Sequence, residues 1–440
     1  MIALISTYEL GRQPFGLASP AAWLMRAGLD VTCHDLSRQS FDASIAEADL
    51  VAFHLPMHTA TRLAVPVIKR LQDLNPAIQI CGYGLYAFLS EAFLRSLGVS
   101  HILGAEYEAD LVRLAMEESP LMTREGVIPR LKFVTPNRDK LPPLTEYATL
   151  QHGTQRRVVG YTEASRGCKH TCRHCPIVPV YGGQFRIVPV EVVVEDLERQ
   201  ISEGAEHVTF GDPDFFNGIG HARKVVQAVA HRFPGLTYDV TVKVEHLLRH
   251  KQLIPELRDT GCLFITSAVE SFDDAVLERL QKGHTRGDVE RAVDICRTAG
   301  VPIAPTFVAF TPWTTIDSYR DFLTEIDRLE LVDSVAPIQL AIRLLVTSGS
   351  PLLDLNDSDL CLESYDQARL LYPWHHKDPQ MDRLANDVGG LIGRNLQVSR
   401  QVMFDQVWER AHLGVGSAVR KSGGHRQRTE VPYLNEPWYC

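Results

Sequence analysis

The chain has 440 residues, of which 45% are hydrophobic and 22% are charged, and its formal net charge is −9. This length predicts two or three globular domains with substantial cores. The negative charge excludes a large polyanion such as DNA as the main partner, so we expect no nucleic-acid partner.

Targeting signals are not evident in the sequence. The start, MIALISTYELG, lacks a basic region, and no apolar run reaches the ~18 residues of a membrane helix. Nine cysteines spread over the chain do not resemble a disulfide framework. We therefore expect a cytoplasmic protein in a reducing compartment, without a membrane partner.

Residues 1–116 alternate short apolar runs with helical patterns. The expected strands are Ile2–Ser6, Val31–His34, Leu50–His54, Ile78–Gly82 and His101–Leu103, and the expected helices are Ala18–Ala27, Thr59–Leu71, Ser90–Leu97 and Glu108–Met116. Such β–α units predict an α/β fold with a flavodoxin-like, doubly wound parallel sheet. Residues 117–157 are predicted to be a linker, because PNRDKLPPLTEY carries three prolines in twelve residues.

Residues 158–346 alternate strand and helix again. The expected strands are Val158–Thr162, His207–Phe210, Leu236–Val242, Leu263–Ala268, Ile303–Phe310 and Ser334–Leu345. The expected helices are Val190–Glu203, Ile219–Arg232, Leu247–Thr260, Asp273–Gln281, Thr285–Ala299 and Thr315–Leu329. Six units are too few for a closed eight-fold barrel, so we expect a partial (β/α)6 barrel whose chemistry sits at the carboxyl ends of its strands.

The loop after the first of these strands carries Cys168, Cys172 and Cys175 in a C-x3-C-x2-C spacing. Three thiolates can hold three irons of a [4Fe–4S] cluster, which leaves the fourth iron open to a ligand that is not protein. An alternative is a tetrahedral zinc site in which His170 or His174 joins the cysteines.

The segment Ser165 to Gly183, SRGCKHTCRHCPIVPVYGG, resembles the radical S-adenosylmethionine (SAM) enzymes, although His174 stands where that family usually has an aromatic residue. The resemblance implies that SAM binds the open iron and is cleaved reductively to a carbon radical. It also implies a partial barrel, a small-molecule substrate and a one-electron reductant of the flavodoxin or ferredoxin type.

The same resemblance assigns SAM-binding roles to side chains at the strand ends. The expected cofactor-binding residues are Gly211, Asp212, Lys243, Glu245, Ser267, Glu270 and Arg343. Asp214 is an alternative to Asp212 as the carboxylate beside the SAM amine, and Arg343 has a guanidinium suited to a carboxylate. Each acidic residue could instead cap the helix that follows it.

The N-terminal stretch from Pro14 to Gly84 resembles cobalamin-binding domains that precede many radical SAM barrels. Residues 8–16 lack the histidine that ligates cobalt in such domains, and Gly82-Tyr83-Gly84 replaces their Gly-Gly. Cobalamin is thus a candidate cofactor, held without a protein ligand, and the alternative is a scaffold that binds no cofactor. His34, His54 and His58 are interpreted as structural.

Residues 347–420 are expected to form a helical cap with helices at Met381–Leu396 and Gln401–Ala411, and residues 421–440 a flexible tail. His375 and His376 are interpreted as solvated surface rather than substrate contacts. The tail ends in Cys440 and resembles the cysteine-rich tails of arsenic-linked radical SAM proteins. Cys440 and Arg343 are the candidate catalytic residues. The other cysteines, Cys33, Cys81, Cys262, Cys296 and Cys361, are interpreted as core residues.

Three reactions of a radical SAM transferase remain open. The first is hydrogen abstraction by an adenosyl radical. The second is a cobalamin-dependent methylation. The third is transfer of a 3-amino-3-carboxypropyl group from SAM to arsenite. A rival of another class is a metal sensor without enzymatic activity, with structural zinc or reactive thiols.

Overall fold

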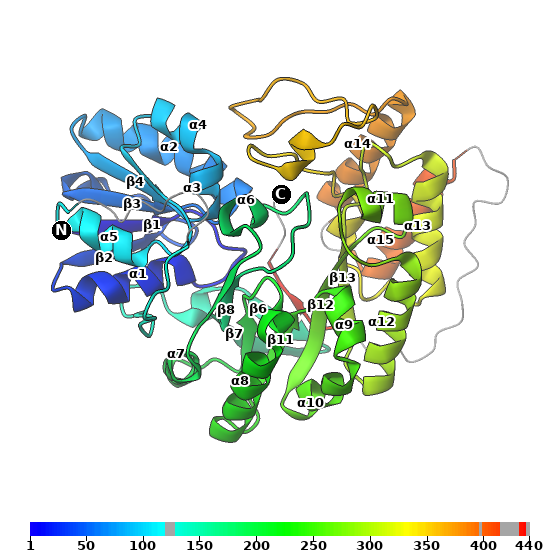
Figure 1. Ribbon diagram of the computed structural model, residues 1–440, viewed down its shortest axis with the longest axis horizontal. Helices are drawn as coiled ribbons and strands as arrows, with labels where there is room; N and C mark the ends of the chain where they lie inside the picture. Colours follow the sequence, from blue (N-terminus) through cyan, green and yellow to red (C-terminus); the bar gives the residue numbers. More distant parts are fainter. Residues whose placement is uncertain (119–127, 396–397, 414–430, 437–440) are drawn as a thin grey trace.

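The computed structural model of the chain describes residues 1–118, 128–395, 398–413 and 431–436. Figure 1 shows an N-terminal α/β part in blue beside a second, curled α/β part in green, with the C-terminal helices in orange packed against the second part. None of the helices described is both long and apolar enough to cross a membrane.

The N-terminal part is a parallel sheet of five strands in the order β2-β1-β3-β4-β5. Its strands are β1 (Ile2–Ser6), β2 (Val31–Asp35), β3 (Leu50–His54), β4 (Gln79–Tyr83) and β5 (His101–Leu103). Its helices are α1 (Phe15–Arg26), α2 (His58–Leu74), α3 (Leu85–Leu89), α4 (Glu91–Ser96) and α5 (Glu108–Ala115). This is the flavodoxin-like order, so the predicted fold of this part is confirmed.

The second part is a curled sheet in the order β13-β12-β11-β10-β7-β6-β14. Its parallel strands are β7 (Gln155–Thr162), β10 (His207–Phe210), β11 (Thr237–Thr241), β12 (Cys262–Glu270) and β13 (Ile303–Phe307). The helices that follow these strands are α7 (Val190–Ser202), α8 (Ile219–Arg232), α9 (Val244–Arg249), α10 (Ile254–Asp259), α11 (Asp274–Arg279), α12 (Arg286–Ala299) and α13 (Ile316–Arg328). The partial barrel is confirmed.

The strands differ from the prediction in two places. The expected sixth strand at 334–345 is a 3₁₀-helix, Pro337–Leu340, followed by a single parallel bridge between Phe310 and Arg343. The side-chain oxygen of Gln339 accepts from the backbone N–H of Phe307 at 2.8 Å, and so takes the place that a strand's carbonyl would fill. The predicted linker contains a further strand, β6 (Thr149–His152), antiparallel to β7.

Beyond β6, the sheet ends in β14 (Tyr433–Leu434), which pairs antiparallel with it. We call residues 431–436 the C-terminal strap. Val431 packs in a small core cluster with Leu150, Val159 and Phe264, so the strap covers the open edge of the partial barrel. The C-terminal helices are α14 (Pro379–Arg394) and α15 (Arg400–Ala411), close to the predicted bounds.

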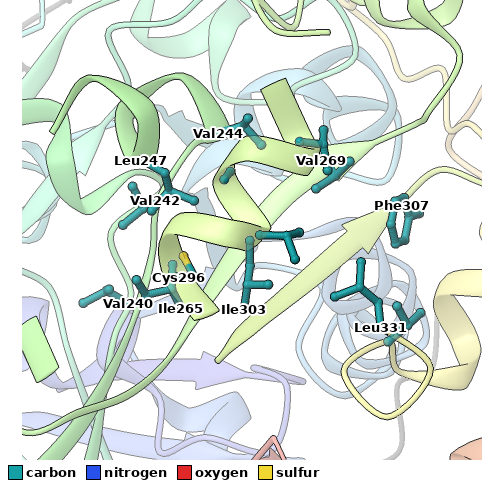
Figure 2. Close-up of a cluster of buried hydrophobic side chains, with 14 of the residues drawn as sticks. Val240, Val242, Val244, Leu247, Ile265, Val269, Cys296, Ile303, Phe307 and Leu331 are labelled. Atoms are coloured by element: carbon teal, nitrogen blue, oxygen red, sulfur yellow. The ribbon is translucent and has the colours of Figure 1, made fainter. Parts of the chain in front are cut away.

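The main core lies between the barrel strands and their helices. Figure 2 shows Val240, Ile265 and Ile303 from three adjacent strands packing against Leu247 of α9 and Cys296 of α12. The aliphatic side chains of the barrel strands therefore lie on the face of the sheet that the helices cover.

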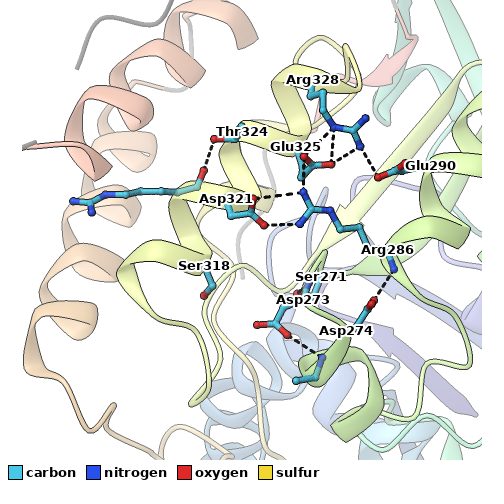
Figure 3. A network of polar contacts seen from close by, with 12 residues as sticks. Ser271, Asp273, Asp274, Arg286, Glu290, Ser318, Asp321, Thr324, Glu325 and Arg328 are labelled. Atoms are coloured by element: carbon cyan, nitrogen blue, oxygen red, sulfur yellow. Dashed lines mark hydrogen bonds and ion pairs between the residues drawn. The ribbon is translucent and has the colours of Figure 1, made fainter. Parts of the chain in front are cut away.

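The outer helices are tied together by ion pairs. In Figure 3, Arg286 at the start of α12 pairs with Asp321 at 2.7 Å and with Glu325 at 2.5 Å, both on α13. Arg328 joins Glu325 to Glu290 of α12. These contacts fix α12 against α13, and Arg286 and Asp321 also line a pocket with Glu270 at the end of β12.

Candidate active site

The three predicted cluster cysteines lie in one loop after β8 (Ser165–Gly167), which follows β7. Cys172 is buried, Cys168 and Cys175 are half-buried, and all three are free thiols. Burial raises the pKa of Cys168, and it raises that of Cys175 to about 12. Metal ligation requires the thiolate, so loading of this loop would release protons.

Asn217, in the 3₁₀-helix Phe215–Gly218 that follows the neighbouring strand β10, fastens this loop. Its side-chain oxygen accepts from the backbone N–H of Lys169 at 3.2 Å, and its NH₂ group donates to the carbonyl of Gly167 at 3.3 Å. Both bonded residues are direct neighbours of Cys168. Asn217 was not predicted, because nothing in the sequence around it signals a contact with a loop about 50 residues earlier.

Gly211 and Asp212 directly follow β10 and lie beside the start of the same loop. The Asp212 carboxylate accepts from the backbone N–H of Ala164 at 2.9 Å and from the Ser165 hydroxyl at 2.5 Å. Burial raises the pKa of Asp212 to about 7. A Cβ at Gly211 would collide with the Tyr161 ring. Asp212 thus braces the cysteine loop, and its contact with SAM stays a prediction.

Glu270 ends β12 with a left-handed backbone (φ 70°) and is brought to the cysteine loop. His174 lies 3.2 Å from its carboxylate and the Lys282 ammonium lies 3.3 Å from the same oxygen. Burial would raise the pKa of Glu270, but Lys282 and His174 lower it to about 2. The site therefore holds an ionised carboxylate with a buried partner of opposite charge.

The other predicted SAM ligands have partners within the protein. The buried Lys243 lies 3.7 Å from Glu245, both just after β11. The Ser267 hydroxyl donates to the carbonyl of Val242 at 2.7 Å. Their SAM-binding roles stay predictions.

Arg343 contacts the C-terminal region. Its guanidinium pairs with Asp382 of α14 at 2.7 Å, donates to the carbonyl of Trp374 at 2.7 Å and lies over the Trp374 ring. These contacts use both terminal nitrogens on the protein, and the proposed catalytic role of Arg343 stays untested.

Several smaller predictions can be placed. Cys33, Cys81, Cys262 and Cys296 are buried, but Cys361 is exposed, so its assignment to the core is wrong. His54 is buried and pairs with Glu9 at 2.6 Å. His375 is exposed and pairs with Glu363. Cys440 and the predicted tail from 421 to 430 lie outside the described residues.

A cavity of about 540 Å³ opens where the carboxyl edges of the two sheets meet. The first sheet contributes Leu10, His54 and Gly84, and the barrel contributes Gly167 and Gly211. The C-terminal strap forms part of its wall through residues 431–434. Ligand sites of α/β proteins lie at such strand ends, so this cavity is the candidate substrate and cofactor site.

Arg166 connects the cysteine loop to the N-terminal part. Its guanidinium lies 2.7 Å from Glu108, 2.7 Å from Glu163 and 3.6 Å from Glu106. Burial, together with the like charge of Glu108, raises the pKa of Glu106 to about 7. Three carboxylates around one cation in a buried place favour retention of a proton by one of them. Glu106 and Glu163 also line the cavity.

Comparison with known proteins agrees with this geometry. Residues 162–326 match the model of the radical SAM superfamily. The chain is 25% identical over 454 residues to the hopanoid C-3 methylase of Methylococcus capsulatus, a match that covers 97% of this chain and 82% of the methylase. It is 24% identical over 217 residues to the bacteriochlorophyllide d C-8(2)-methyltransferase of Chlorobaculum tepidum, covering 44% of this chain and 43% of that enzyme.

Two solved structures share the fold. The cobalamin-dependent radical SAM enzyme OxsB aligns with a TM-score of 0.69 at 15% identity, over 90% of this chain and 67% of OxsB. The radical SAM methyltransferase TsrM from Kitasatospora setae aligns with a TM-score of 0.59 at 18% identity, over 75% of this chain and 71% of TsrM. The predicted order of a flavodoxin-like part before a partial barrel is therefore confirmed.

Proposed function

We propose that this chain, whose residues 162–326 match the model of the radical SAM superfamily, is a cobalamin-dependent radical SAM methyltransferase with a small-molecule substrate. The observation that carries this proposal is the cavity shared by the carboxyl edges of the two sheets, with Gly167 and Ile177, which lie on either side of the cysteine loop in the sequence, in its wall. Similarity to the hopanoid methylase along 97% of the chain supports it.

The chain's own residues would bind and orient the reactants. A [4Fe–4S] cluster held by Cys168, Cys172 and Cys175 would supply the electron that breaks a carbon–sulfur bond of SAM. Gly211, Asp212, Lys243, Glu245, Ser267 and Glu270 are the proposed SAM contacts. The buried ammonium of Lys282 keeps Glu270 ionised beside the loop. A one-electron reductant of the flavodoxin or ferredoxin type is the proposed partner.

The first sheet fits cobalamin as a neighbour of the cluster. Cobalamin, when bound, carries a methyl group between SAM and substrate. The cavity wall there is made of Leu10, Leu85 and the buried His54. Glu9 holds the Nδ1 nitrogen of His54 at 2.6 Å and the His54 ring leaves no room for a Cβ at Gly16. His54 is thus a packing residue, which supports binding without a protein ligand to cobalt.

SAM cleavage tests the enzymatic proposal. Protein reconstituted anaerobically with iron and sulfide is given SAM and dithionite, and the SAM fragments are identified by mass spectrometry. We expect about four irons per chain and cleavage of SAM, both lost in Cys172→Ala and both kept in Cys361→Ala, which alters an exposed free cysteine. Colourless protein that takes up zinc at the cysteine loop would instead support the alternative of a metal sensor without enzymatic activity.

Cobalamin binding needs its own test. We expect hydroxocobalamin to co-elute with the protein in gel filtration, and Leu85→Arg to abolish this because it places a long cation in the cavity. Leu63→Arg is the matched control, since Leu63 is 47% exposed on α2 of the same sheet. Equal retention of cobalamin by both variants would place the corrin elsewhere.

A second candidate is transfer of the 3-amino-3-carboxypropyl group of SAM to arsenite. The C-terminal strap supports it: Glu436 pairs with Arg38 at 3.5 Å and packs on Gly11, next to the cavity-lining Leu10. The fourth residue after Glu436 in the sequence is Cys440, the proposed catalytic thiol of this reaction. A thiolate there would bind a soft metalloid. Methylthioadenosine among the SAM fragments, formed only with arsenite, would favour this reaction over methylation.

A further inference from the structure

Three side chains that the proposed reaction does not use converge beside the cysteine loop. His170 lies within the loop, Asp214 follows β10, and His246 belongs to α9. The His170 Nε2 atom is 3.3 Å from the Asp214 Oδ2 atom, and the His246 Nδ1 atom is 2.6 Å from the same oxygen. One candidate ligand atom from each of the three lies within 4.8 Å of the others.

The group is buried and its polar atoms are unsatisfied. The side chains of Asp214 and His246 are 1% and 0% exposed, and that of His170 is 13% exposed. Neither close contact has the angles of a hydrogen bond, so His170 Nε2, Asp214 Oδ2 and both nitrogens of His246 lack hydrogen-bond partners among the described residues. Buried polar atoms without partners are costly, and several at one point indicate a missing ion or water.

The rest of the geometry orients these atoms. The other oxygen of Asp214 accepts from the backbone N–H groups of Phe216 at 3.2 Å and Lys243 at 3.4 Å, which leaves Oδ2 directed at the histidines. The second nitrogen of His170 faces the Glu245 carboxylate at 3.8 Å. A carboxylate behind a histidine is the usual outer partner of a metal-binding imidazole.

We propose that His170, Asp214 and His246 bind a divalent transition-metal ion of the zinc class, separate from the cysteine loop's own cluster. Two imidazole nitrogens and one carboxylate oxygen are a donor set that zinc accepts, with a fourth position open to water. Because His170 lies between Cys168 and Cys172, the ion fastens the middle of the cysteine loop to the end of β10 and to α9. This site does not depend on the reaction that the enzyme catalyses.

Metal analysis of the full chain tests the site. Protein with a reconstituted cluster is equilibrated with Zn²⁺ against a competing chelator, and iron and zinc are counted in the same sample by mass spectrometry. We expect one zinc per chain beside about four irons in the wild type. Zinc affinity should fall about 10-fold or more in His246→Gln and in Asp214→Asn. Asparagine still caps the 3₁₀-helix at Phe215–Gly218, so the second variant keeps the local fold.

Two controls make the outcome decisive. His250→Gln alters a ring 5.9 Å from that of His246 but outside the three ligands, and should keep both metals. Cys172→Ala should lose the iron and keep the zinc. The proposal is overturned if the cluster-loaded wild type retains no zinc, if Asp214→Asn and His246→Gln bind it as well as the wild type, or if zinc leaves as iron fills the cysteine loop.

Discussion

At the scale of single residues, the sequence predicted which polar side chains follow the strands, but not which residues they contact. The sequence predicted that Glu270 follows a strand beside the cluster. It did not predict that Lys282 and His174 share the carboxylate, because His174 is 96 positions away and only the folded barrel brings the two together. Asn217 escaped prediction for the same reason, since its two partners lie in the loop after another strand.

Asn217 provides the first prediction. Asn217→Ala removes the acceptor of the Lys169 N–H and the donor to the Gly167 carbonyl, both next to Cys168. We expect a loss of about 1–3 kcal/mol in the free energy of unfolding and a lower iron content after gel filtration. Asn75→Ala, which breaks a side-chain bond to Ala46 in the first sheet, should cost stability without iron loss. Equal iron in both variants would contradict the role of Asn217.

Glu106 predicts a pH dependence of stability. Its folded-state pKa is raised to about 7 from an ordinary value of 4.5, so the folded chain holds a proton that the unfolded chain releases between these values. This contribution is full below the ordinary value and is lost as the pH rises through about 7. Glu106→Gln should therefore show a smaller fall in Tm between pH 5 and 8 than the wild type. Glu91→Gln, in an exposed pair with Arg95, should show the wild-type slope.

At the scale of elements, hydrophobic periodicity found the strands and helices that pair in sequence order. It failed where a partner comes from elsewhere. Strand β6 was not predicted, because it has only four residues and its outer partner, β14, comes from residues 433–434, far away in the sequence. The expected sixth strand fails because Pro337 lacks an N–H and Gln339 reaches the sheet with its side chain.

Gln339 therefore tests why the sixth strand is absent. Gln339→Leu keeps a side chain of similar size but leaves the buried N–H of Phe307 without its acceptor. We expect the free energy of unfolding in urea to fall by about 1–3 kcal/mol. Gln227→Leu removes an exposed bond to Glu256 and should change it by less than about 0.5 kcal/mol. If Gln339→Leu left the free energy of unfolding unchanged, water or another group would have to accept the hydrogen bond of the Phe307 N–H.

At the scale of the whole molecule, the sequence predicted the order of the parts but not their contacts. The predicted boundaries at 116, 157, 346 and 420 stay predictions. Arg138, inside the predicted linker, is 3% exposed and bonds to three separate segments. Its guanidinium pairs with Asp196 of α7 at 2.9 Å and donates to Gln13 and to the Tyr161 carbonyl. Arg138 of the predicted linker is thus a buried contact between these segments.

Arg138→Met should cost about 3–5 kcal/mol in unfolding free energy, because Asp196 would remain buried without its cation. Adding Asp196→Asn removes that charge and should recover part of the loss, measured by denaturant unfolding of the single and double variants. Additive losses would show that the two side chains act independently.

The C-terminal strap has a consequence for the order in which the protein is made. Residues 433–434 add a strand to a sheet whose other strands all lie before residue 308 in the sequence. Residues 431–434 also line a cavity whose other lining residues come from earlier in the sequence. On the ribosome, both sheets can therefore form while one side of the cavity still lacks its last wall. We expect a bulky cofactor to enter the cavity most easily during this interval, before residues 433–434 pair with β6.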